Sequence, residues 1–144
     1  MNKIKFYLVA LTIAATTLTS LPSCKKGSDD PAISFRTRDD RFTNTWTLVK
    51  YEKNGNVQNT SGSSYIYNIF KNGSLTETIE GSVFGFSART VKDGTWSFVN
   101  DKEDVKITVE GKTTIYDIQR LASKELWLKK NDGTDTHVYY FEGL

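Results

Sequence analysis

The sequence contains one cysteine, one histidine and two prolines among 144 residues, and its longest apolar run is short. A single cysteine cannot form an internal disulfide, so a disulfide-stabilised scaffold is excluded. One histidine and one thiol are too few for the usual zinc and copper sites. The nucleophile-elbow, phosphate-loop and zinc-protease motifs do not occur, and the acidic turns match no calcium-loop spacing. We therefore predict no enzyme activity, no catalytic residue, no metal and no cofactor.

The first 23 residues have the pattern of a signal peptide. Lys3 and Lys5 give a positive start, residues 6–15 form an uncharged apolar run, and small and hydroxyl residues follow. Such an order is typical of a cleaved export signal. A retained membrane helix is the alternative, but the apolar run is too short to cross ~30 Å of hydrocarbon comfortably.

Cys24 follows Leu21, Pro22 and Ser23 directly at the end of this segment. The pattern Leu-x-Ser-Cys resembles the lipobox of bacterial lipoproteins, and the resemblance implies that Cys24 carries a diacylglycerol after signal cleavage. Two or more acyl chains hold a protein stably on a membrane, whereas one holds it only marginally. We therefore expect a lipid anchor at Cys24 and a place in the cell envelope, on the outer membrane. Whether the protein faces the periplasm or the cell surface stays open.

Residues 24–35 are polar, charged and aperiodic, which predicts a flexible tether. Asp29 and Asp30 resemble the acidic export tags of some surface lipoproteins of Bacteroidetes, but a solvated linker explains them equally well. Without Lys3 and Lys5, basic and acidic side chains are equal in number. This balance argues against a nucleic-acid partner.

Residues 36–144 are predicted to form one all-β domain with a short N-terminal helix. Thr37 and Asp40 have the spacing of a helix cap, and the helix is expected over 38–44, with Phe42 as its apolar anchor. From Trp46 onward, runs of β-branched and aromatic residues alternate with turn pairs that favour hairpins. The predicted turns are Asn54-Gly55, Asn72-Gly73, Glu80-Gly81, Asp93-Gly94, Glu110-Gly111 and Asp132-Gly133. The predicted strands are 45–53, 64–71, 74–80, 83–90, 95–99, 104–110, 113–121, 125–130 and 136–142.

Several predicted strands alternate strictly between apolar and polar residues. Val105, Ile107 and Val109 share one face, as do Leu126 and Leu128. This pattern indicates an antiparallel sheet with one wet face, and eight or nine short strands indicate a barrel or a sandwich. Mostly short connections favour sequential order, so we predict a single antiparallel up-and-down β-barrel that is monomeric.

These features together resemble the lipocalin-like lipoproteins of Bacteroidetes. The lipobox, tether and short helix precede Trp46, which matches the tryptophan of the lipocalin Gly-x-Trp motif, with Asn44 in place of the glycine. The segments 70–75, 94–98 and 116–128 resemble an early hairpin, a central Gly-x-Trp-x-Phe strand and the closing hairpin. The resemblance implies a lipocalin-like barrel in which an arginine, here Arg120, stacks across Trp46.

Aromatic residues make up 12% of the chain, and most lie in predicted strands. In a short barrel such rings either fill the interior or line a cavity for a small apolar ligand, and the short strands favour a largely filled interior. Residues 82–87 flank Gly85 with apolar rings, which indicates a bent strand or a flap near the barrel mouth. The candidate lining residues are Tyr67, Phe70, Phe84, Phe86, Trp96, Tyr116 and Tyr139.

Two functions remain open on this evidence. The leading hypothesis is non-catalytic binding of a small hydrophobic or amphipathic molecule inside the barrel. The alternative is a cell-envelope interaction or structural module with a filled barrel, in which the outer surface or the polar loop 57–63 binds a partner protein or a glycan.

Overall fold

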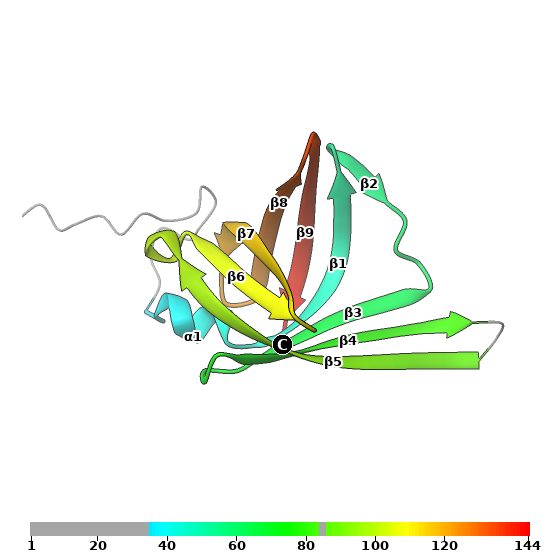
Figure 1. The fold of residues 1–144 in the computed structure, drawn as a ribbon, viewed down its shortest axis with the longest axis horizontal. Coiled ribbons are helices and arrows are strands. Elements are labelled where there is room, and N and C mark those ends of the chain that lie inside the picture. Colours follow the sequence, from blue (N-terminus) through cyan, green and yellow to red (C-terminus); the bar gives the residue numbers. More distant parts are fainter. Residues whose placement is uncertain (1–34, 84–85) are drawn as a thin grey trace, which may run out of the picture.

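The computed structural model describes residues 35–83 and 86–144, which form a closed antiparallel β-barrel of eight strands with one extra strand and one short helix (Figure 1). This confirms the predicted all-β, up-and-down barrel. The elements are α1 (Arg38–Phe42), β1 (Thr45–Lys53), β2 (Asn56–Gln58), β3 (Ser63–Ile69), β4 (Ser74–Val83), β5 (Phe86–Val99), the 3₁₀ turn η1 (Asn100–Lys102), β6 (Asp104–Val109), β7 (Lys112–Leu121), β8 (Glu125–Asp132) and β9 (Asp135–Gly143).

The strands follow one another around the barrel in chain order, and the last strand returns to the first. β1 pairs with β3, and β3 to β8 each pair with the next strand. β9 closes the sheet on β1, from Trp46 opposite Gly143 to Lys53 opposite His137. Closure satisfies the hydrogen-bonding groups that an open sheet would leave at its two edges. β2 is the extra strand and forms a small hairpin with the end of β1.

The predicted alternation places the core as expected. On β6, Val105 and Ile107 point inward and are buried, while Lys106 between these two residues is exposed. On β8, Leu126 and Leu128 are likewise buried. The remaining fully or nearly buried apolar side chains come from α1 and five other strands: Phe42, Trp46, Ile69, Leu75, Ile118, Leu121 and Phe141.

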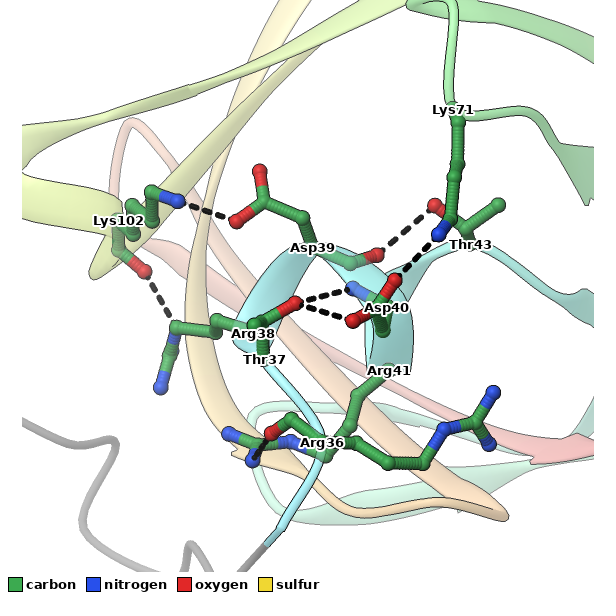
Figure 2. Close-up of polar contacts among 9 residues, drawn as sticks. All are labelled: Arg36, Thr37, Arg38, Asp39, Asp40, Arg41, Thr43, Lys71 and Lys102. Carbon is green, nitrogen blue, oxygen red and sulfur yellow. Dashed lines mark hydrogen bonds and ion pairs between the residues drawn. The ribbon is translucent and has the colours of Figure 1, made fainter.

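Helix α1 begins at the predicted cap and is held to one end of the barrel by charged side chains (Figure 2). The Thr37 hydroxyl accepts a hydrogen bond from the Asp40 backbone N–H at 3.1 Å. Asp40 pairs with Lys71 at 2.5 Å, and Asp39 pairs with Lys102. The Lys71 ammonium, with help from Thr37, lowers the pKa of Asp40 to about 2, so Asp40 stays charged well into acid.

Two of the predicted turns are wrong. Glu80-Gly81 lies inside β4 and Asp93-Gly94 lies inside β5, so three predicted strands are in fact two long ones. The ladder between β4 and β5 continues to Val83 opposite Phe86, the described residues on either side of 84–85. Gly94 is glycine because of close packing rather than chain reversal: a Cβ there would lie 2.4 Å from the carbonyl oxygen of Thr108.

Several predictions concern residues outside the described part of the chain. The signal peptide, Cys24 and nearly all of the tether lie in residues 1–34, and Phe84 and Gly85 lie in the second undescribed segment. They stay predictions.

Candidate functional site: a tyrosine-lined cavity

One end of the barrel is filled by aromatic side chains. Phe42 of α1 packs into the barrel with its ring centre 4.8 Å from Trp96 and 5.2 Å from Phe98. The indole N–H of Trp46 donates to the Phe42 carbonyl at 2.9 Å, and the indole N–H of Trp96 donates to the Phe70 carbonyl at 2.9 Å. The expectation of a filled interior therefore holds for this end only.

The other end is hollow because β1 and β3 separate there. Their pairing stops at Thr47 opposite Ile66, and the end of β1 pairs with β2 instead. A register shift between Leu48 and Lys50 marks a bulge at this place. Bulges bend a strand and redirect its side chains. Figure 1 shows β1 and β3 diverging, with β2 and the chain after it spanning the space between them.

A cavity of about 500 Å³ occupies this hollow end. Its volume lies within the range of roughly 300–1,000 Å³ that is typical of small-molecule sites. The lining comes from β1, from the end of β2, from the β2–β3 connection and from β3, β4, β7 and β9: Leu48, Tyr51, Gln58, Asn59, Thr60, Ser61, Ser63, Tyr65, Ile66, Tyr67, Glu77, Tyr116, Tyr139 and Phe141.

Tyrosine rings form a continuous surface in this cavity. Tyr51 stacks on Tyr139 at 5.0 Å between ring centres, and Tyr116 meets Tyr139 edge to face at 5.9 Å. Burial raises the pKa of Tyr67, Tyr116 and Tyr139 above the usual tyrosine range. Their hydroxyl groups therefore stay neutral, and each can offer a ligand an uncharged hydrogen-bonding group.

Glu77 is the one charged residue in the lining. The Tyr67 hydroxyl donates to a Glu77 oxygen at 3.1 Å, and Tyr67 stands directly opposite Glu77 in the β3–β4 register. Glu77, Tyr67 and Tyr116 also border a second, smaller cavity of about 310 Å³. The second cavity contains three lysines, of which Lys92 pairs with Glu110 at 2.8 Å.

Six of the seven predicted lining residues lie in the described part of the chain, Phe84 being outside it, and these six separate into distinct groups. Tyr67, Tyr116 and Tyr139 come together in the cavity. Trp96 belongs to the filled end, where it packs on Phe42. Phe70 and Phe86 are 47% and 78% exposed and line neither cavity. Phe70 sits at the start of the β3–β4 turn, and Phe86 sits at the tip of the β4–β5 hairpin, which extends past the rest of the barrel (Figure 1).

The predicted stacking of Arg120 on Trp46 is wrong. The Arg120 guanidinium lies over the Trp127 ring at 5.3 Å and pairs with Glu125 at 2.7 Å. A register shift between Ile118 and Arg120 turns Ile118 and Leu121 inward and leaves Arg120 on the outer face. Trp46 is fully buried inside the barrel, on the opposite side of the wall.

Sequence reasoning missed most of the polar lining. The stretch 57–63, which the sequence suggested as a partner-binding loop, spans the end of β2, the connection and the start of β3, and it contributes to the cavity wall Gln58, Asn59, Thr60, Ser61 and Ser63. Glu77 carried a readable signal, because strand alternation places it on the same face as Leu75 and Ile79. No sequence signal placed Tyr51 in the cavity, because the bulge in β1 changes which residues of that strand face inward.

The lone histidine, His137, lies on β9 opposite Lys53, the last pair of the β1–β9 ladder. Its ring stacks parallel to Tyr51, and its Nδ1 is 2.7 Å from the Tyr51 hydroxyl. Residues 35–83 and 86–144 contain no group of three or more His, Cys, Asp or Glu side chains placed to hold a metal ion. No helix in the same residues has the length and hydropathy needed to cross a membrane.

Comparison with solved structures identifies the class of this barrel. No protein-family model matches the sequence, and no curated protein matches it either. A lipocalin-like protein from Bacteroides uniformis has a similar fold, with a TM-score of 0.56 and 15% identity over 72% of this chain and 99% of that one. Japanin from Rhipicephalus appendiculatus, solved with cholesterol, gives a TM-score of 0.49 at 10% identity, over 71% of this chain and 75% of japanin. The fold is a lipocalin-like β-barrel.

Proposed function

We propose that this protein is a non-catalytic, membrane-anchored lipoprotein that binds a small hydrophobic or amphipathic molecule in the barrel. The tyrosine-lined cavity of about 500 Å³ carries this proposal. The cavity combines apolar ring surface with a few hydroxyl, amide and carboxylate groups, which is the usual make-up of a small-molecule site. Such a space favours ligand binding over the alternative of a filled barrel that acts through its outer surface.

Binding of the neutral fluorescent hydrophobe N-phenyl-1-naphthylamine tests the cavity. We expect saturable binding with a dissociation constant in the micromolar range or below, and displacement by non-fluorescent hydrophobes. Thr60→Trp should weaken binding by about tenfold, the equivalent of about 1.4 kcal/mol, because Thr60 is half-buried in the cavity wall and the indole would fill the mouth.

Thr90→Trp is the matched control, since Thr90 is exposed on β5 and lines neither cavity. It should leave binding unchanged. Absence of saturable binding in the unmodified protein, or equal affinity in both variants, would contradict a ligand site in this cavity.

The anchor is a separate part of the proposal. It rests on the lipobox-like sequence ending at Cys24 and on the polar segment that follows. Mass spectrometry of protein made in a Gram-negative host should find an N-terminus at Cys24 carrying two or three acyl chains. Cys24→Ser should abolish the modification and release the protein from the membrane fraction. An intact, unmodified N-terminus in the unchanged protein would contradict the anchor.

A further inference from the structure

The charge inside the larger cavity points to the chemical class of its ligand, on the premise that the proposed binding function is correct. Glu77 is the single ionisable carboxylate in the lining, and no lysine or arginine joins it there. The lining has no group of opposite charge to neutralise an anion. A negatively charged ligand placed beside Glu77 would therefore meet a carboxylate of like charge with no cation in the lining to offset the repulsion.

The Glu77 carboxylate also makes few interactions with the described side chains of the protein. Within the described residues, its side-chain hydrogen bond comes from Tyr67, which occupies one of the two oxygens. Lys92 lies opposite Glu77 in the β4–β5 register, but its ammonium pairs with Glu110 at 2.8 Å. Glu110 is accordingly the main cause of the raised pKa of Lys92. Glu77 makes only a smaller electrostatic contribution to the raised pKa of Lys92, and among the described residues its second carboxylate oxygen accepts no side-chain hydrogen bond.

The rings beside Glu77 suit a cation as well. Tyr51, Tyr139 and Tyr116 form a contiguous set of rings, and Tyr67 adds a fourth next to the carboxylate. The face of an aromatic ring is electronegative and attracts ammonium groups, most strongly where water is excluded. The lining thus places a carboxylate next to several aromatic rings, a combination of groups that binds alkylammonium ions.

We infer that the cavity binds an amphiphile with a cationic head, either a protonated amine or a quaternary ammonium group. Glu77 and the tyrosine rings hold the head, and Leu48, Ile66 and Phe141 contact the apolar tail. The three lysines of the smaller cavity offer the opposite chemistry, a carboxylate head, and the experiment below separates the two.

The test uses three ligands with the same ten-carbon tail, titrated into the purified full chain by calorimetry below their micelle concentrations. These are decyltrimethylammonium, decanoate and decanol. We expect decyltrimethylammonium to bind about tenfold more tightly than decanoate, with decanol between them. Glu77→Gln should weaken the binding of decyltrimethylammonium by about tenfold and leave decanol within about twofold.

Glu80→Gln is the matched control, because it makes the same charge change on the same strand at an exposed residue paired with Arg89. It should change none of the three affinities. Decanoate binding as tightly as the ammonium ligand, or an unchanged preference in Glu77→Gln, would overturn the inference and leave the binding function standing. Failure of all three ligands to bind would overturn the binding function itself. The comparison of ligands on the unmodified protein needs no variant to fold.

Discussion

Replacing Trp46 with alanine is expected to destabilise the protein by about 3–5 kcal/mol, a large part of the total stability of a domain of this size. Trp46 lies on β1 opposite Gly143 of β9 and is fully buried at the filled end of the barrel, where its indole N–H reaches α1. The substitution would leave a cavity of almost the whole indole. It would also leave the Phe42 carbonyl without the hydrogen bond that it now accepts at 2.9 Å. Urea unfolding followed by far-ultraviolet circular dichroism measures the change.

Trp127→Ala is the matched control for this prediction. Trp127 is only half-buried on the outer face, where its ring meets Tyr140 edge to face at 5.3 Å and Arg120 at the same distance. Losing these contacts should cost about 1 kcal/mol. Equal destabilisation by the two substitutions would show that Trp46 is not the centre of the filled end.

Gly94→Ala is expected to cost about 3 kcal/mol, although it adds only one methyl group. The new Cβ would lie 2.4 Å from the carbonyl oxygen of Thr108 and 3.0 Å from a methyl carbon of Val109. Both atoms belong to β6, which pairs with β5 at this point, so the backbone of two neighbouring strands would have to separate. Thermal unfolding should show a clear fall in melting temperature with the β-sheet spectrum retained.

Gly81→Ala tests whether the cost arises from the close approach or from any added side chain. Gly81 lies in β4 of the same hairpin, and a Cβ there would lie 3.2 Å from the Ser63 hydroxyl and 3.3 Å from the Gly62 carbonyl oxygen, both farther than the 2.4 Å approach at Gly94. Alanine also lowers the conformational entropy of the unfolded chain relative to glycine. Gly81→Ala should therefore change stability by less than about 1 kcal/mol. A stable Gly94→Ala variant would mean that β5 and β6 do not approach as closely as described.

The two glycines also show where the sequence misled. A glycine after an acidic residue favours a turn, and this is correct at Glu110-Gly111, where both residues have positive φ. At Gly81 and Gly94 the same pairs lie within long strands. Local sequence does not distinguish the two cases, because the need for glycine at Gly94 comes from a β6 atom that lies fourteen residues further along the chain.

The bulges in β1 and β7 are the reason why some side chains of the predicted site face the other way from what alternation indicates. Alternation predicted the inward residues correctly wherever the ladder was regular, as in β6 and β8. One extra residue reverses the alternation for the rest of a strand. The shift in β1 turned Tyr51 into the cavity, and the shift in β7 turned Arg120 outward.

The sequence by itself determined the class of fold, the strand order and most of the buried residues, because period-two alternation and short turns are local properties of the chain. It also identified three of the five tyrosines that line the cavity, and alternation indicates the strand face on which Glu77 lies. The tertiary structure alone decided which end of the barrel is filled and where the wall separates. Those features depend on the packing of Phe42 of α1 into the barrel and on the bulges. They also depend on the change of partner along β1, which pairs with β3 in its first part and with β2 at its end. Each of them is a contact between segments far apart in the chain, which no local pattern records.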